Sequence, residues 1–179
     1  MRALKEILSL VVLAVIIVVP VRVFVAQPFV VEGLSMFPTF HNGDYLIIDE
    51  LSYHLRTPTR GEVVVFRYPN DPSIFYIKRV IALPGESVSI DRGVVSVTRT
   101  DGSTITLSEP YVVQEDATYT QTVTLGTDQY FVMGDNRPKS SDSRIWGPLP
   151  EKDIVGRAFV RIFPVHTASL LPGSAALPH

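Results

Sequence analysis

The sequence predicts a mainly β protein: an antiparallel β-sheet domain with a small inserted β-lobe, preceded by one membrane-spanning helix. Three observations predict this organisation. An apolar run near the N-terminus is long enough to cross a bilayer. After it, short segments rich in β-branched and aromatic residues alternate with turn signals. No alternation of strands with helical patterns is visible, so a parallel α/β sheet is not expected.

Composition sets the limits on the class of protein. The 179 residues, 46% of them hydrophobic, suffice for one packed core with a small lobe and exclude disorder throughout. A net charge of −2 and a pI near 6.1 argue against nucleic acid as a partner. The absence of cysteine excludes disulfides, zinc–thiolate sites and cysteine nucleophiles. The four histidines lack metal-ligand spacing, so no metal site is expected.

Residues 1–26 form the predicted membrane anchor. From Ile7 to Ala26 the chain has 20 mostly apolar positions, which as a helix would span about 30 Å, the thickness of a bilayer core. Arg22 is tolerable near the end of the span because its stem can extend to the headgroups. A buried core helix and a cleaved signal peptide are the alternatives. Phe24 occupies a position where cleavage usually needs a small residue, which favours an uncleaved anchor.

The charges that flank this run predict its orientation. Arg2 and Lys5 precede the run and favour a cytoplasmic N-terminus, although Arg22 at the other end weakens the asymmetry. We therefore expect a single-pass protein of the cell membrane whose β-domain is extracytoplasmic.

Residues 27–165 form the predicted β-domain. Asp101-Gly102 is a hairpin signal, and it places a small inserted lobe at about 87–128. The segment 166–179 is short of charge and broken by two prolines, so we expect a loosely ordered tail. The predicted strands cover residues 45–48, 63–68, 75–82, 87–90, 94–98, 103–107, 121–125, 130–133 and 154–163.

Lys78 is a candidate general base. In a strand over residues 75–82 it shares one face with Tyr76 and Val80, and an apolar environment disfavours the charged ammonium. Lowering its pKa from about 10.4 to about 8 requires roughly 3 kcal/mol of destabilisation of the charged form. The alternative interpretation is a strand lysine whose ammonium extends to solvent.

Ser35 is a candidate nucleophile. It lies between Gly33, which permits unusual backbone angles, and Pro38, which prevents a strand from continuing. Such a turn can present a hydroxyl while its own N–H remains free to stabilise an oxyanion. Taken alone, however, a serine in a turn is more often a surface residue or a local cap.

A third segment, residues 134–144, combines polar groups in an apparently solvated loop. Asp142 could pair with Arg144 or Arg137 and fix the loop. The hydroxyl of Ser140 or Ser143 could orient an uncharged lysine through one hydrogen bond.

Together these segments resemble the type I signal peptidases, membrane-bound serine–lysine enzymes that remove signal peptides, in their short, single-anchor form. The resemblance runs from the anchor to about residue 163, and no single segment is specific without the others. Four groups of residues match. They are residues 33–39; residues 60–66; residues 76–80 together with 84–86; and residues 134–137 together with Ser140, residues 142–144 and residues 146–147.

The resemblance implies a role for each matching residue. Ser35 would be the nucleophile and Lys78 the general base, with Ser140 positioning the lysine amine. Asp142 and Arg144 would support the loop.

One position departs from the pattern of some family members. Those members carry a serine two positions before the nucleophile, whose hydroxyl adds to the oxyanion hole, whereas this chain has Gly33. The oxyanion would then depend on the Ser35 N–H and one further donor.

The same resemblance implies the substrates, partners and alternatives. The reaction needs no cofactor, and the partners would be signal-peptide-bearing precursors, membrane lipid and the protein-export translocon. A dedicated maturation peptidase of the same chemistry and a membrane-tethered, non-catalytic β-domain that binds exported peptides are the alternative functions. Shallow apolar pockets would select small side chains, and the candidate pocket residues are Phe29, Val31, Met36, Tyr76 and Val80.

Overall fold

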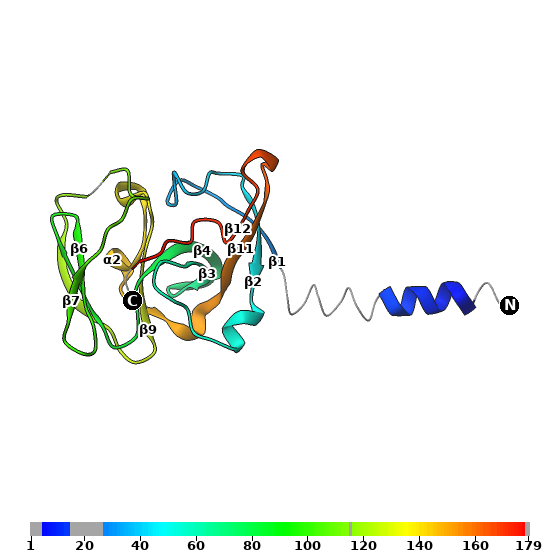
Figure 1. The fold of residues 1–179 in the computed structure, drawn as a ribbon, viewed down its shortest axis with the longest axis horizontal. Helices are drawn as coiled ribbons and strands as arrows, with labels where there is room; N and C mark the ends of the chain where they lie inside the picture. Colours follow the sequence, from blue (N-terminus) through cyan, green and yellow to red (C-terminus); the bar gives the residue numbers. More distant parts are fainter. Residues whose placement is uncertain (1–4, 15–26, 115, 178–179) are drawn as a thin grey trace.

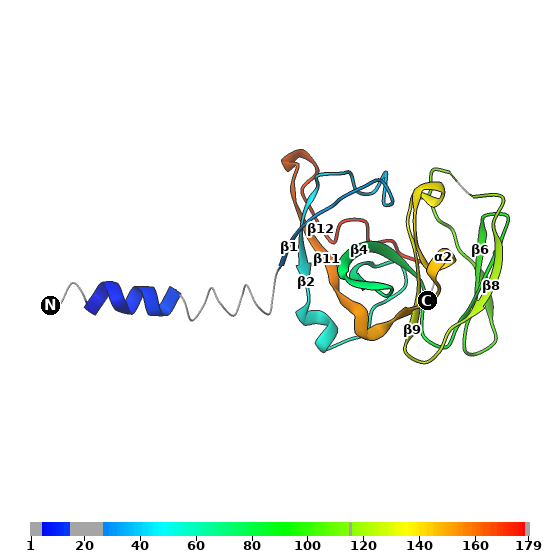
Figure 2. The ribbon, with the colours of Figure 1, turned by 180° about the vertical axis from the view of Figure 1, so that it is seen from behind.

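The structure, a computed structural model, describes residues 5–14, 27–114 and 116–177. Two antiparallel sheets make up the β-domain, a large one that carries β1 to β4 and a small one that carries β6 and β7 (Figure 1). Seen from behind, β9 and the adjacent α2 lie on the side of the large sheet that is nearer to the small sheet (Figure 2). The predicted mainly antiparallel architecture is therefore confirmed.

The predicted membrane anchor lies only partly within the described residues. Residues 5–14 are helical, and residues 15–26 of the anchor lie outside the described part. Among the described residues, no helix has both the length and the apolar character needed to cross a bilayer.

Eight strands of the described chain form the large sheet, in the order β1-β2-β11-β3-β4-β9-β10, with β12 paired to β11. The edge strand β1 is not among the predicted strands: it has only four residues, and one is a proline, which an edge strand tolerates. The bounds are β1 Gln27–Val30, β2 Tyr45–Asp49, β3 Val63–Tyr68, β4 Asp71–Ala82, β9 Gln129–Met133, β10 Leu149–Pro150, β11 Ile154–Phe163 and β12 Ser169–Leu170.

The small sheet lies within the segment in which we expected an inserted lobe. Its order is β7-β6-β5-β8, and β6 and β7 form the predicted hairpin around Asp101-Gly102. Gly102 has a φ of +85°, a conformation that glycine adopts without steric cost. The strands are β5 Ser87–Asp91, β6 Val94–Thr98, β7 Thr104–Thr106 and β8 Thr120–Thr124.

A shared hydrophobic cluster joins the small sheet to the large one. Val88 and Val97 of the small sheet belong to the same buried cluster as Ile81 of β4 and Phe131 of β9. Burial of one apolar side chain stabilises a fold by about 1.5–3 kcal/mol, so this cluster fixes the lobe against the sheet that carries Lys78.

The C-terminal segment differs from the loosely ordered tail that we expected. Ser169–Leu170 form β12, and the N–H of Ala175 donates to the carbonyl of Gly61. Leu177 is 5% exposed and belongs to the cluster that joins the two sheets. Low charge and prolines do not exclude an ordered extended segment whose apolar side chains are buried by distant strands.

Candidate active site

Ser35 lies in a tight turn after β1 that two hydrogen bonds attach to the 134–144 loop. Gly33 has the predicted unusual backbone angle, with φ +87°, and its N–H donates to Asn42 Oδ1 at 2.9 Å. The carbonyl of Ser35 accepts from the N–H of Asn136 at 3.0 Å, and Asn136 Nδ2 donates to the carbonyl of Leu34 at 3.1 Å. The nucleophile candidate therefore has a fixed backbone.

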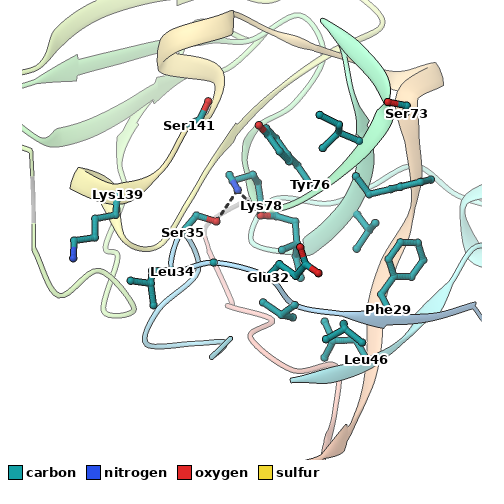
Figure 3. Close-up of a pocket in the computed structure, with 17 residues that line it drawn as sticks. Phe29, Glu32, Leu34, Ser35, Leu46, Ser73, Tyr76, Lys78, Lys139 and Ser141 are labelled. Atoms are coloured by element: carbon teal, nitrogen blue, oxygen red, sulfur yellow. Dashed lines mark hydrogen bonds between the residues drawn. The ribbon is translucent and has the colours of Figure 1, made fainter. Parts of the chain in front are cut away.

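Lys78 projects from the middle of β4 towards this turn. Its Nζ lies 2.8 Å from Ser35 Oγ and 2.8 Å from the carbonyl oxygen of Ile77 (Figure 3). The Tyr76 ring centroid is 5.1 Å from Nζ, and the residue is only 3% exposed. The structure thus brings together two residues separated by 43 positions in the sequence.

Burial changes the protonation of Lys78. Desolvation lowers the pKa of its ammonium from 10.5 to about 8, against the opposing effect of the negative charges of Asp142 and Asp135. At this pKa about one molecule in ten has a neutral amine at pH 7 and about half at pH 8. The amine can therefore accept a proton in the neutral pH range.

Gly134 allows the loop to approach the Ser35 turn closely. A Cβ at this position would lie 2.2 Å from Ser140 Oγ and 2.5 Å from the Ser35 carbonyl oxygen. Any side chain would separate the two segments, so glycine is required here by the available space.

Ser140 lies beside the site but does not make the hydrogen bond expected of it. Its Oγ is buried and has no hydrogen-bond partner among the described residues, and the Lys78 amine is directed at Ser35 and Ile77 instead. A buried hydroxyl without a hydrogen bond lowers the free energy of unfolding by about 1–3 kcal/mol. The Ser140 hydroxyl would therefore gain from a hydrogen-bond partner, and it is free to accept one.

Asp142 pairs with Arg144, one of the two partners that the loop sequence left open. Arg144 Nε donates to Asp142 Oδ1 at 2.8 Å and Nη2 to Oδ2 at 2.9 Å, a bidentate arrangement. Asp142 is fully buried and also accepts from the N–H of Gly134 at 3.0 Å. Arg144 additionally donates to the carbonyl of Arg137 at 2.6 Å, so the pair connects both ends of the loop.

A second buried pair supports the site from the other face of β4, and our sequence reasoning missed it. Arg79 is 0% exposed and donates to Asp135 through Nε at 2.9 Å and Nη2 at 2.6 Å. Thr39 Oγ1 donates to the same carboxylate at 2.5 Å. The available signal was strand alternation, which places Arg79 on the face opposite Lys78 among apolar residues, where a charge needs a partner.

A cleft of about 590 Å³ begins at the dyad and extends along β1 and β4. Phe29, Val31 and Tyr76 line it as predicted, and Ile74 and Phe75 add apolar surface that the sequence did not indicate. Figure 3 shows Phe29 and Leu46 near one end of the cleft and Ser35 towards the other. The cleft can accommodate an extended apolar peptide.

Two predicted pocket residues lie in the hydrophobic core instead of the cleft. Met36 is 1% exposed and packs with Phe40 and Ile48, because the tight turn directs it away from Ser35. Val80 is 0% exposed and packs with Val132, since the cleft ends at Lys78 and β4 continues into the sheet. Strand alternation alone does not tell where a cleft ends.

The arrangement has the parts needed for acyl transfer. The Ser35 hydroxyl lies within hydrogen-bonding distance of an amine whose pKa is depressed, which is how a serine–lysine pair can be activated. The N–H of Ser35 makes no hydrogen bond within the described part of the chain and remains available to an oxyanion. Over residues 5–14, 27–114 and 116–177 there is no group of three side chains able to hold a metal ion.

Comparison with known proteins yields consistent matches. Residues 4–163 match the family described as "Signal peptidase, peptidase S26". The chain is 38% identical to a probable signal peptidase I-1 of Synechocystis sp., over 90% of this chain and 83% of that protein. It is 42% identical to a probable signal peptidase I-2 of the same organism, over 90% and 74%.

A solved structure also matches. The crystal structure of a signal peptidase I from Enterococcus faecalis is 28% identical in sequence, covers 57% of this chain and 97% of that one, and gives a TM-score of 0.47.

Proposed function

The chain belongs to the signal peptidase S26 family, and we propose that it cleaves signal peptides from exported precursors with Ser35 as nucleophile and Lys78 as general base. Signal-peptide cleavage follows from the homologues. The assignment of the two residues is supported by one observation, the 2.8 Å separation of Ser35 Oγ from a buried Lys78 Nζ.

The reaction begins with a neutral Lys78. Its amine accepts the Ser35 proton while Oγ attacks the carbonyl carbon that ends the signal peptide. The lysine then returns the proton to the leaving amine of the mature protein, which leaves an acyl-enzyme ester. A water molecule, deprotonated by the same amine, hydrolyses the ester and regenerates Ser35. The Ser35 N–H would stabilise the oxyanion in both steps.

We assign Ser140 to orientation of the amine. A neutral lysine has two N–H groups and one lone pair. If the lone pair faces the Ser35 hydroxyl and one N–H donates to the Ile77 carbonyl, one N–H is left without an acceptor. The buried, unpaired Ser140 Oγ can supply that acceptor after rotation of its side chain. The Asp142–Arg144 pair would keep Ser140 and Gly134 against the Ser35 turn.

The cleft would hold the residues before the cut. Phe29, Val31 and Tyr76 give it apolar walls next to the dyad, which favours small apolar side chains close to the scissile bond. Binding there would place the scissile carbonyl at Ser35.

We also propose that the N-terminal run anchors the protein in the membrane, with the N-terminus cytoplasmic and the β-domain extracytoplasmic. The apolar side chains of the described helical part are exposed: Ile7, Leu8, Leu10, Val11, Val12 and Leu13 are 49–65% exposed. No other part of the described chain covers these side chains, and membrane lipid would cover them. Anchoring would hold enzyme and precursor at the same surface, with lipid and the translocon as neighbours.

The experiment that tests the dyad compares three full-length proteins in detergent: wild type, Ser35→Ala and Lys78→Arg. Each is incubated with a precursor that carries an Ala-x-Ala signal peptide, and the products are identified by mass spectrometry. We expect a single cut after the second alanine with the wild type only, because guanidinium remains protonated and cannot act as a base.

Each outcome has a defined meaning. Cleavage by folded Ser35→Ala would exclude Ser35 as nucleophile. Absence of cleavage by the wild type, together with measurable peptide binding, would favour the tethered binding domain.

A further inference from the structure

We propose that a second hollow next to Ser35 binds the mature side of the scissile bond, and that Lys139 there favours substrates with an acidic residue at the first or second position after the cut. The inference rests on the proposed function. It extends substrate recognition from the signal peptide, before the cut, to the first residues of the mature protein, after the cut.

The hollow lies next to the main cleft and shares two wall residues with it. It has a volume of about 310 Å³ and is lined by Leu34, Phe37, Val113, Gln114, Asn136 and Lys139. Leu34 and Lys139 line the main cleft as well. Leu34 directly precedes the nucleophile, so the hollow lies beside the Ser35 turn.

The position of the hollow decides which part of a substrate it would receive. In Figure 3, Leu34 and Lys139 lie on the side of Ser35 opposite to Phe29 and Leu46. The residues before the cut need the apolar main cleft, which contains Phe29. A substrate whose scissile carbonyl is at Ser35 must then continue past Leu34, and its first residues after the cut enter the hollow.

Within the described part of the chain, the charge in the hollow comes from Lys139. Lys139 is exposed, and its ammonium makes no ion pair or hydrogen bond with the described part of the chain. The other side chains that line the hollow are neutral. Glu32 lines the main cleft but not the hollow, so among the described residues the charged side chain on the mature side is the basic Lys139. A carboxylate on the substrate would gain a partner there, and an ammonium would be repelled.

The remaining walls limit the size of the substrate residues and connect the hollow to the lobe. Phe37 and Leu34 are 40% and 50% exposed, and Val113, in the segment between β7 and β8, is 73% exposed. These side chains give an apolar surface around the Lys139 ammonium, and a carboxylate-bearing side chain with an aliphatic stem, such as glutamate, matches both features.

The test uses peptides that share an Ala-x-Ala signal-peptide end and differ only after the cut, with Glu, Gln or Lys at the first or at the second position. Pairs of peptides compete for the same full-length enzyme, and the ratio of kcat/KM values is measured at low ionic strength. The variants are Lys139→Glu and Lys139→Gln. Lys152→Glu, which makes the same charge change at an exposed site outside both cavities, is the matched control.

We expect the wild type to prefer Glu over Lys by about two- to fivefold, the range of an exposed ion pair. The preference should disappear in Lys139→Gln, reverse in Lys139→Glu, persist in Lys152→Glu and decrease in high salt. An unchanged Glu-to-Lys ratio in folded Lys139 variants that cleave the Gln peptide would overturn the inference and leave the proposed function intact. Failure of the wild type to cut the Gln peptide would instead contradict the proposed function.

Discussion

Lys78 shows, at the scale of a single residue, how stability and chemistry oppose each other. The side chain is 3% exposed, and no carboxylate of the described residues lies within ion-pair distance of it, so burial of the ammonium is not fully compensated. The same desolvation lowers its pKa to about 8 and makes it a usable base. The residue is therefore suited to proton transfer at a cost in folding free energy.

The lowered pKa predicts how activity depends on pH. Protonated Lys78 cannot accept a proton, so cleavage of a soluble peptide should increase from pH 6 to pH 9 with a midpoint near 8. The measurement is the single-turnover rate as a function of pH. A rate that does not change over this range would contradict the assignment of Lys78 as base.

Removal of the charge at Lys78 should stabilise the fold. Because its folded-state pKa lies below the unfolded value of 10.5, the unfolded state binds more protons between about pH 8 and 10.5, and stability rises with pH through that window. Lys78→Met should therefore be inactive but more stable by about 1–3 kcal/mol at pH 7, with the difference shrinking towards pH 10.5.

Urea unfolding at several pH values, with catalysis scored separately, measures this effect. Lys152→Met, at an exposed lysine, is the control and should differ little from the wild type. Equal or lower stability of Lys78→Met at pH 7 would show that the ammonium is not strained in the fold.

Gly134 should be intolerant of even one methyl group. The added Cβ would meet Ser140 Oγ and the Ser35 carbonyl at 2.2 and 2.5 Å and push the loop from the nucleophile. We expect Gly134→Ala to lower kcat by about tenfold to a hundredfold, since small displacements of reacting groups have effects of this size.

Steady-state kinetics on a peptide substrate tests this prediction. Gly126→Ala is the matched control, because a Cβ there meets the movable end of the Gln129 side chain at 3.1 Å. Comparable kinetics of the two variants would mean that the loop can shift without moving the dyad.

At the scale of secondary-structure elements, the C-terminal segment and the 134–144 loop both support β4. The carbonyl of Gly173 accepts from the buried guanidinium of Arg79, and the same guanidinium holds Asp135 at the start of the loop. The Arg79 Cζ also lies 3.8 Å from the centroid of the Tyr111 ring, in the segment between β7 and β8. One side chain on the far face of β4 thus connects the tail, the loop and the lobe behind the dyad.

The tail should contribute measurably to stability. Leu177→Ala removes a 5%-exposed side chain from the cluster between the sheets and should cost about 2–4 kcal/mol. The midpoint of urea unfolding measures the loss. Leu170→Ala in β12, where the side chain is 73% exposed, serves as control and should change stability by less than about 0.5 kcal/mol. Equal effects would show that the tail does not pack as described.

At the scale of the whole molecule, the β-domain buries its own core, whereas the N-terminal segment exposes apolar side chains. Residues 27–177 contain all three hydrophobic clusters of the described chain, and none of these clusters includes a residue of 5–14. The described N-terminal helix, residues 5–14, therefore contributes no residue to these clusters.

Deletion of residues 2–26 should separate membrane binding from catalysis. We expect about tenfold or greater loss of co-sedimentation with lipid vesicles, and kcat on a soluble peptide within about twofold of the full chain. Leu55→Lys, a change at an 83%-exposed leucine of the β-domain, is the control for general loss of surface hydrophobicity. Unchanged vesicle binding of the shortened protein would locate the lipid contact in the β-domain.

The fold class, most of the strands and the residue types of the site could be predicted from the sequence, because alternation, turn residues and short motifs are local properties. The hairpin at Asp101-Gly102 needed no long-range information, whereas the loop sequence left Arg144 and Arg137 as alternative partners of Asp142. The apolar neighbours of Lys78 along its strand made a lowered pKa possible but left open a lysine that extends to solvent, and burial in the assembled sheet decides between the two.

The contacts between distant groups and the end of the cleft became visible in the folded chain alone. Ser35 and Lys78 come together across 43 positions, Met36 and Val80 lie in the core, and Leu177 closes the cluster between the sheets. These contacts depend on strand order and on packing between distant segments, and no local pattern encodes them. Burial and close approach are properties of the assembled sheets.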